Sequence, residues 1–201
     1  MSETNIQIVT IIILGLLGLI GGIAAIRVVL TSSILKGIVR HYCLCIIISS
    51  SLINLSHLFW GAPRALWSSL SKYDVLDNTI GFIAFTSVSV MYIAKILLAF
   101  NRFMAISWNG AYYRSLEKVQ FIQYFLLIAY SVIMSAPMLF PGFRVIWVND
   151  GKSFWFIEDS PNAELYMNIT QPWAAYFVIA ICTSLDSMTF FLIKKRIMVK
   201  I

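Results

Sequence analysis

Residues Ile83 to Ile106 read IAFTSVSVMYIAKILLAFNRFMAI, a long apolar stretch in which Lys95 is the one charge before Arg102. A helix needs about 20 mostly apolar residues to cross the hydrocarbon core of a bilayer, which is roughly 30 Å thick. The stretch meets that length. We therefore interpret it as a membrane-spanning helix and Arg102 as the point where that helix meets water.

The composition of the whole chain is that of an integral membrane protein. Of its 201 residues, 60% are apolar and only 12% are charged, whereas about a quarter of the residues of an average soluble domain are charged. The net charge is +6, but the basic residues stand in short clusters between apolar runs. A nucleic-acid binder gathers them on one solvated surface, so the sequence argues against nucleic acid as a partner.

Further apolar runs set the fold class. Five runs reach spanning length, and none alternates as a transmembrane β-barrel strand does. Closed helices are then the way to satisfy backbone hydrogen bonds in lipid. The N-terminus has no basic segment of a cleaved signal, so we expect the first run to remain as a helix. We predict an all-α membrane bundle, one domain over 1–201, with five transmembrane helices at about 6–26, 41–62, 78–103, 119–140 and 172–193.

Lysine and arginine predict the orientation, because they are enriched in cytoplasmic connections. The ends after the first, third and fifth runs carry ten basic residues and one acid, and the opposite side carries four basic residues and seven acids. We predict the N-terminus outside and the C-terminus inside. The longest connection, 141–171, is then extracellular. Its many aromatic residues favour a compact lid over a disordered loop.

Three residues at the end of the third run, Asn101, Arg102 and Phe103, admit two interpretations. In one, Arg102 snorkels to the interface and only helps to fix the topology. In the other, its permanently charged guanidinium with several donors holds, and later releases, partners on neighbouring helices.

Two ionisable residues stand within the membrane spans. Lys95 lies seven residues before Arg102, on the same helical face and about two turns deeper. Asp186 lies eight residues before Lys194, at a similar depth in the fifth run. Because intramembrane charges usually face the bundle interior and pair, one hypothesis is an ion pair between Lys95 and Asp186. The alternative is that Lys95 snorkels while Asp186 is protonated or hydrated.

The remaining polar features indicate packing rather than chemistry. His57 and Asn54 share a face of the second run, where a single histidine without a second ligand predicts a hydrogen-bonded packing group and no metal site. Asn168 begins an Asn-Ile-Thr glycosylation pattern on the predicted outer side, close to the fifth run. The three cysteines lie inside apolar runs, so we expect no extracellular disulfide. No catalytic motif is present, and we predict neither an enzyme nor a cofactor.

With this layout, the chain resembles the nematode serpentine chemoreceptors of the Srx type, which are rhodopsin-like G-protein-coupled receptors. The resemblance runs through most of the chain. Its most specific part is the Asn-Arg-Phe segment, which is similar to the Asp-Arg-Tyr motif that contacts G protein. The matching segments are Gly15-Leu16-Leu17-Gly18, SHLFWGAP at 56–63, LLAFNRFMAI at 97–106 and TSLDS at 183–187.

The resemblance implies a multi-pass chemosensory receptor of the plasma membrane. An extracellular small molecule would enter a pocket under the aromatic loop, and a heterotrimeric G protein would contact Arg102 and the loop that carries Arg114 and Lys118. Association with other receptors is also compatible with the resemblance. Candidate pocket residues, chosen for their depth, are His57, Trp60, Met91 and Tyr92.

The chain departs from that family in several places. Asn101 replaces the usual acid, so it cannot hold Arg102 by charge. Gly21 and Gly22 stand where we would expect an asparagine. No cysteine is available to tie the long loop to the third helix, so we expect packing alone to hold the loop. The chain ends after the fifth helix, where the family would continue through two more.

Two alternative functions remain open. The chain could be a truncated, non-signalling receptor fragment that acts through full-length partners. It could instead be a small transporter or channel subunit that uses Lys95 and Asp186 as a charge relay. A transporter of that kind predicts matched broken helices, whereas only Pro137 interrupts a predicted span.

Overall fold

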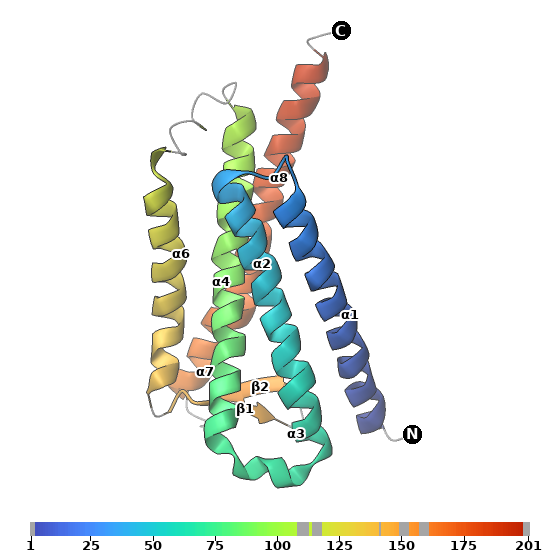
Figure 1. Cartoon of the computed structure of the whole chain (residues 1–201). Helices are drawn as coiled ribbons and strands as arrows, with labels where there is room; N and C mark the ends of the chain where they lie inside the picture. The colour runs from blue at the N-terminus through green and yellow to red at the C-terminus, as the bar shows by residue number, and fades with distance from the viewer. Residues whose placement is uncertain are drawn as a thin grey trace.

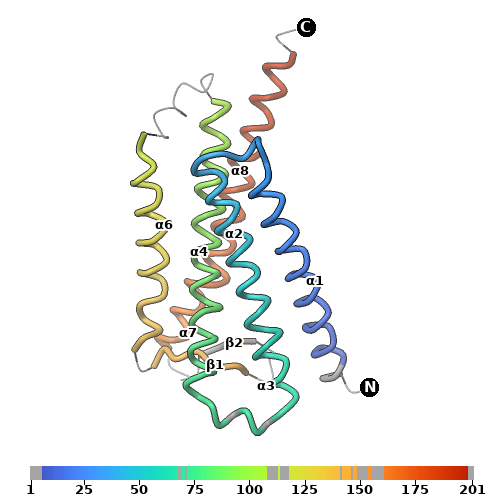
Figure 2. Tube along the Cα trace, in the orientation of Figure 1, coloured from blue at the N-terminus to red at the C-terminus, as the bar shows by residue number. Residues whose placement is uncertain are grey.

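The protein is a bundle of long helices closed at one end by a β-hairpin (Figure 1). The structure is a computed structural model, and it describes residues 3–107, 113, 118–140, 142–148, 153–156 and 161–198. Five helical segments in this part of the chain are long and apolar enough to cross a membrane, which confirms the predicted number. Figure 2 shows the chain running back and forth between the two ends of the bundle, with the termini at opposite ends.

The first two spans are joined by a tight turn. Helix α1 covers Glu3–Thr31, and α2 covers Gly37–Ser56. Gly37 has φ of 57°, a left-handed conformation that suits glycine. The guanidinium of Arg40 donates to the carbonyls of Leu35 and Ser32 at 2.8 and 2.9 Å. These bonds satisfy carbonyls of the connecting turn.

Helix α4, Asp74–Ile106, is the centre of the bundle. It packs against α2, α6 (Gln120–Ser135), α8 (Ala174–Met198) and strand β1, while α1 packs on α2. Within the apolar window of each span, 39% of the α4 residues are buried, against 11% for the first and the last spans. The helix that contains Ile83 to Ile106 is therefore the one that most of the others contact.

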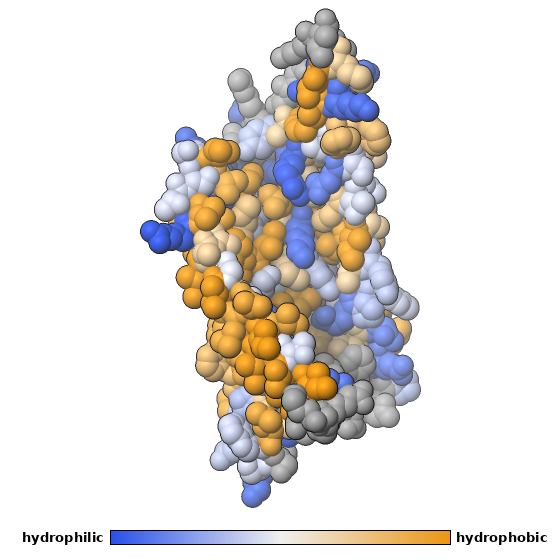
Figure 3. All heavy atoms as spheres, turned by 90° about the vertical axis from the view of Figure 1, so that its right-hand side faces the viewer, coloured by the Kyte–Doolittle hydropathy of each residue, from blue (hydrophilic) through white to orange (hydrophobic). Residues whose placement is uncertain are grey.

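The outer faces of the bundle are apolar, as a lipid solvent requires. Large side chains such as Leu17 and Ile23 on α1, Phe121 and Ile133 on α6, and Phe177 on α8 are more than half exposed. One face of the molecule shows a broad apolar surface of this kind (Figure 3). Such a surface would be an aggregation liability in water, so the fold indicates a multi-pass membrane protein.

Two of the spans that are longer than predicted, the second and the fifth, each contain a π-helical turn. The second span passes from α2 through the π turn His57–Gly61 into α3, Ala62–Leu66, and Pro63 follows directly after that π turn and Ala62. The fifth begins at Pro161 with α7, Pro161–Asn168, and passes through Ile169–Trp173 into α8. We expected Pro172 to start this helix. It lies inside instead, because a π turn relieves the clash of proline with the preceding turn.

The aromatic loop contains a β-hairpin, which is not among the elements predicted from the sequence. Strand β1, Val145–Val148, pairs antiparallel with β2, Ser153–Phe156, in the register Val145↔Phe156. A short 3-10 turn, Ala136–Leu139, leads from α6 toward it, and another, Ser68–Lys72, joins α3 to α4. Hereafter the end of the bundle that carries this sheet is called the hairpin end, and the other is called the opposite end.

Glycines of α1 let that helix approach α2 closely. A Cβ built on Gly18 would lie 2.2 Å from Nδ2 of Asn54, and one on Gly22 would lie 2.4 Å from Oγ of Ser51. A Cβ on Gly21 would meet nothing within 4 Å. Gly18 and Gly22 thus form a small-residue face of the kind that packs membrane helices.

We expect Gly18→Leu to lower the free energy of unfolding by about 1 to 3 kcal/mol, because it overfills the contact between α1 and α2. Gly21→Leu is the matched control, and its effect should stay within about 0.5 kcal/mol. Thermal midpoints in detergent micelles measure both. Equal midpoints for the two variants would contradict the assigned packing face.

Candidate functional site

The hairpin is fastened to the helix ends by a buried carboxylate. Asp77, in the first turn of α4, is 1% exposed. Its Oδ1 accepts a hydrogen bond from Nε1 of Trp60 at 2.7 Å and from the backbone N–H of Trp147 at 3.1 Å. Next to it, Oδ1 of Asn78 accepts from the backbone N–H of Val145 at 3.0 Å. The expectation that packing alone holds this loop is therefore wrong: side-chain acceptors on α4 bind the free N–H groups of β1.

Arg64 completes this anchor. Its Nε lies 3.5 Å from Oδ2 of Asp77, and both side chains are almost fully buried. That nitrogen makes no hydrogen bond within the described part of the chain, so the contact is an ion pair only. A buried charge of either sign is costly without its partner, so Arg64 and Asp77 depend on each other.

Two glycines form the seats into which the hairpin side chains fit. A Cβ on Gly61 would lie 2.4 Å from Cζ3 of Trp147, and one on Gly81 would lie 2.7 Å from Cγ1 of Val145. The two seats lie on different helices, in the π turn after α2 and on α4 respectively. Glycine is needed at both because the strand approaches the helices more closely than any side chain would allow.

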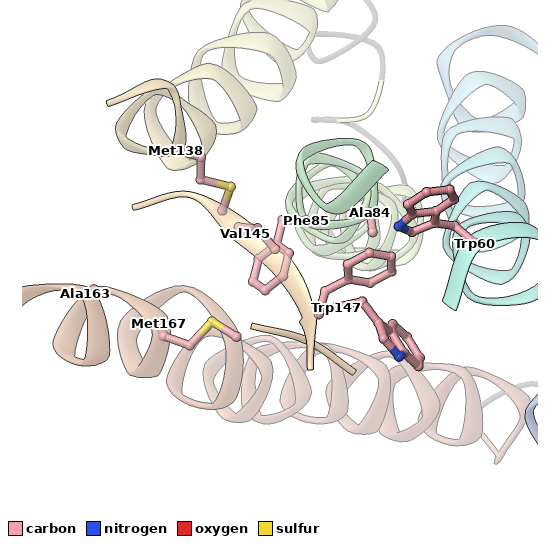
Figure 4. Close-up of a cluster of buried hydrophobic side chains, with 9 residues drawn as sticks. Trp60, Ala84, Phe85, Met138, Val145, Trp147, Ala163 and Met167 are labelled. Carbon is pink, nitrogen blue, oxygen red and sulfur yellow. The ribbon is translucent and has the colours of Figure 1, made fainter. Parts of the chain in front are cut away.

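Around these seats the hairpin end has a continuous apolar core (Figure 4). Val145 and Trp147 of β1 lie among side chains from every neighbouring element, and Phe154 of β2 joins them. Trp147 and Phe154 make an edge-to-face contact with ring centroids 5.2 Å apart. The predicted compact aromatic lid is thus confirmed in this segment. Its buried neighbours are Trp60, Ala84, Phe85, Met138, Ala163 and Met167.

A cavity of about 250 Å³ lies under the hairpin, between α2, α4 and the fifth span. Its lining is mostly apolar, with two polar side chains, His57 and Gln171. The Nδ1 atom of His57 is 2.9 Å from the carbonyl of Ile53, so in the neutral ring it must be the donor and Nε2 is left as an acceptor. The full lining is Ile53, His57, Ala84, Phe85, Val88, Phe154, Met167 and Gln171.

The four predicted pocket residues lie in different environments. His57 lines the cavity, and its ring also makes T-shaped contacts with the rings of Trp147 and Phe154. Trp60 lies in the core and donates to Asp77 instead. Met91 accepts a 3.4 Å contact from the hydroxyl of Ser50, and Tyr92 is half-buried on α4; neither belongs to this lining. The structure thus brings His57 alone of the four to the cavity.

At the opposite end, Arg102 pairs with Asp186. The guanidinium of Arg102 on α4 lies 3.2 Å from the Asp186 carboxylate on α8, and the two side chains are about half exposed, at 51% and 47%. The structure differs here from the hypothesis that Lys95 is the partner of Asp186. Lys95 is half-buried on the same helix and contributes to the electrostatic environment of Cys182, as Arg102 and Asp186 do.

The physical reason is the stagger of the two helices. Arg102 lies four residues before the end of α4, and Asp186 lies twelve residues before the end of α8, so α8 extends about 12 Å further at 1.5 Å per residue. Figure 1 shows this overhang. Arg196 of α8 donates to the carbonyl of Ile106 in the last turn of α4. Depth counted from each helix end therefore puts Asp186 level with Lys95, whereas in the structure it lies beside Arg102.

Asn101 does not face its neighbour Arg102. It is 1% exposed, and its Nδ2 donates to the carbonyl of Leu97 and to Oε1 of Gln123 on α6, each at 2.8 Å. The hydroxyl of Tyr42 on α2 donates to the same Gln123 oxygen at 2.8 Å. The side chain that replaces the usual acid thus belongs to a network, centred on Gln123, that joins α2, α4 and α6. The carboxylate near the arginine comes from α8.

Phe103 borders a second hollow at this end. It lies between α4 and α8, has a volume of about 570 Å³, and is almost wholly apolar, with Lys195 at its edge. Its lining is Phe103, Ser107, Met188, Phe191, Leu192 and Lys195. Arg114, the other residue expected to contact G protein together with Lys118, lies outside the described residues.

Asn168, the glycosylation candidate, is the last residue of α7, and Thr170 of the same pattern is 2% exposed. The Thr170 hydroxyl donates to the carbonyl of Tyr166 at 2.9 Å. A helical, partly buried acceptor differs from the surface loop that this modification usually requires. Glycosylation of Asn168 stays a prediction. Among the described residues, no three potential metal ligands gather, and the three cysteines are free thiols.

Sequence reasoning missed Arg64, Asp77, Asn78 and Gln171. In the sequence, Arg64 and Asp77 are two of the charges in the connections whose counts predict the orientation. The sequence did contain a signal for this anchor. Asp77 and Asn78, a carboxylate and an amide, lie three and four residues after the first residue of α4, and the long loop has no cysteine that could hold it instead. Gln171 gave no such signal, because its position depends on the π turn.

Comparison with known families gives a match over most of the chain. A family model described as serpentine type 7TM GPCR chemoreceptor Srx matches residues 12–200. No curated protein shows significant similarity to the chain. The match covers nearly the whole chain, including both the hairpin end and the Arg102 segment.

Proposed function

The chain belongs to the Srx family of serpentine 7TM chemoreceptors, and on that premise we propose that it binds an extracellular small molecule at the hairpin end and signals through a heterotrimeric G protein. A multi-pass membrane protein of this family has a chemosensory, receptor-like role. The ligand, the G protein, the plasma membrane and the outward orientation of the hairpin belong to the proposal.

The observation that carries the proposal is the cavity under an anchored lid. A ligand site in a helix bundle is concave, mostly apolar and supplied with a few polar groups. The hollow lined by His57 and Gln171 has that composition. Phe154 of the hairpin is part of its lining, so ligand contacts can bias the position of the lid relative to α4.

The pair formed by Arg102 and Asp186 supports coupling at the other end. It connects α4 to α8 through side chains that are half exposed, so the pair is weak and easily exchanged for another partner. We propose that it restrains Arg102 in the resting state, in place of the missing acid at Asn101. A G protein would then compete with Asp186 for the arginine.

The relay proposed for a transporter is less well supported. It requires a direct exchange between Lys95 and Asp186, whereas the carboxylate lies against Arg102. The fragment alternative, in which the chain associates with other receptors, remains a separate outcome of the experiment below.

We expect Asp186→Asn to raise ligand-independent nucleotide exchange on a co-expressed G protein by up to about fivefold, because an exposed ion pair contributes about 1 kcal/mol or less. Arg102→Ala should abolish the exchange. Lys95→Gln is the matched control: it removes a neighbouring charge but leaves the pair intact, so exchange should not change.

Surface labelling of an N-terminal tag in intact cells must first show that the variants reach the membrane with the N-terminus outside. If Lys95→Gln reproduces the effect of Asp186→Asn, Lys95 rather than Arg102 is the functional partner. If no variant produces exchange above that of cells without the chain, signalling by this chain is refuted and the fragment alternative is favoured.

A further inference from the structure

The second hollow, between α4 and α8 at the opposite end, follows one face of α8. Four α8 side chains line it at intervals of three, four and seven residues, which places them on the same side of the helix. They are Met188, Phe191, Leu192 and Lys195. Seven residues span about 10 Å of helix axis. The hollow therefore runs along α8 and has Lys195 at its outer end.

This hollow lies on a different flank of the α4–α8 contact from the pair of Arg102 and Asp186. On α8, Lys195 follows Asp186 by nine residues, which is about two and a half turns, so the two side chains leave the helix on opposite sides. On α4, Ser107 follows Arg102 by five residues, about 140° around the helix. The hollow is thus separate from the ion pair.

The walls of the hollow are apolar and reach the outer surface of the bundle. Met188 and Phe191 are more than half exposed. The hydroxyl of Ser107, which also lines the hollow, donates to the carbonyl of Met104 at 3.4 Å. Apolar hollows hold water poorly. In a membrane, the acyl chain of a lipid is the group that suits such walls.

A positive charge stands at the outer end of the hollow. Because α8 extends past the end of α4 (Figure 1), Lys195 is exposed, and it forms no ion pair with any described residue. The neighbouring Arg196 is engaged, since its guanidinium donates to the carbonyl of Ile106. The sequence has no acid after Asp186. The Lys195 ammonium group is therefore available to an anionic headgroup, and no nearby carboxylate on α8 competes for it.

We propose that the second hollow binds an anionic phospholipid, with an acyl chain along the face from Met188 to Leu192 and the headgroup phosphate at Lys195. Basic groups at the membrane surface attract anionic lipids in this way. A zwitterionic lipid offers the same chain, but its own cation lies beside the phosphate, so it gains less from Lys195. The inference goes beyond the proposed function, because it requires neither a ligand at the hairpin end nor a G protein.

The test compares dioleoylphosphatidylglycerol with dioleoylphosphatidylcholine, which differ only in the headgroup, on the full chain in detergent micelles. Native mass spectrometry counts the bound lipid, and the rise of the thermal midpoint with lipid concentration measures the affinity. We expect phosphatidylglycerol to bind more tightly. Lys195→Gln should weaken its binding by about fivefold, the factor for one lysine near an anionic surface, and should leave phosphatidylcholine binding unchanged.

Three further variants locate the lipid. Lys194→Gln removes the adjacent exposed lysine, which is outside the lining, and should leave both affinities unchanged. Met188→Trp fills the hollow and should weaken both lipids. Phe190→Trp enlarges an exposed side chain outside the lining and should weaken neither. Because all four positions are exposed, the lipid-free thermal midpoints of these variants and of Lys195→Gln should match that of the unmodified chain.

Each outcome decides the inference. Equal weakening of phosphatidylglycerol by Lys194→Gln and Lys195→Gln would assign the lipid to the general basic charge of this end, and the inference fails. Equal binding of the two lipids by the unmodified chain would refute selection of an anionic headgroup. If Met188→Trp changes neither lipid affinity but lowers nucleotide exchange, the hollow receives part of the G protein instead. A chain that binds lipid as expected and produces no exchange would refute only the proposed signalling.

Discussion

Asp77→Ala should lower the free energy of unfolding by about 3 to 5 kcal/mol, the cost of leaving a buried charge without its partner. The substitution removes the acceptor for Trp60 Nε1 and for the backbone N–H of Trp147, and it takes away the carboxylate that lies 3.5 Å from Nε of the buried Arg64. Because two of these donors belong to different elements, the hairpin should also detach from α4.

Asp74→Ala is the matched control for this prediction. Asp74 lies in the same first turn of α4 but is exposed, so its loss should change the free energy by about 0.5 kcal/mol or less. Asp77→Asn keeps one carbonyl acceptor and removes the charge, so its loss of unfolding free energy should lie between the losses of Asp74→Ala and Asp77→Ala. Thermal midpoints in micelles measure stability, and protease cleavage within 149–152 measures detachment of the hairpin. Equal midpoints for Asp74→Ala and Asp77→Ala would refute the anchor.

Double replacement distinguishes the ion pair from the hydrogen bonds. One way in which Asp77→Ala can destabilise the chain is by removing the counter-charge of the buried Arg64 guanidinium. If this effect dominates, adding Arg64→Met should recover part of the lost unfolding free energy, since an apolar side chain can replace a buried charge. No recovery would assign the cost to the hydrogen bonds of Trp60 and Trp147.

The spans could be predicted from the sequence because they depend on one local quantity, the length of each apolar run. Where a proline interrupts a run, that rule fails. Pro172 was expected to begin a helix, but the π turn Ile169–Trp173 accommodates it and the helix starts at Pro161. Nothing in the local sequence distinguishes a proline that starts a helix from one tolerated within it, because the outcome depends on what the adjacent turns pack against.

The partners of the charged residues could not be predicted for a related reason. Depth along a helix can be counted from sequence, but the stagger between two helices cannot. Asp186 was therefore paired with Lys95, whereas the overhang of α8 brings it to Arg102. Asp77 precedes the third predicted span and so counts among the acids of the connections in the sequence, and its burial follows only from the hairpin that covers it.

The second large effect is expected at Gly61. Gly61→Ala adds one carbon atom 2.4 Å from the ring of Trp147, which is 1% exposed and surrounded by core side chains. A buried, rigid ring cannot move aside as the end of a flexible side chain could. We expect Trp147 to leave its seat, with a loss of about 3 to 5 kcal/mol, similar to deletion of a buried aromatic side chain.

A double-mutant cycle shows whether this loss comes from Trp147. If the added methyl acts only by displacing the ring, Gly61→Ala should cost little in a chain that already carries Trp147→Ala, so the two losses will not add. Gly21→Ala controls for the helix propensity of alanine, because a Cβ at that position meets nothing within 4 Å. Additive losses would mean that Gly61 acts on the π turn itself, and the seat for the hairpin would then have to be assigned to Gly81 alone.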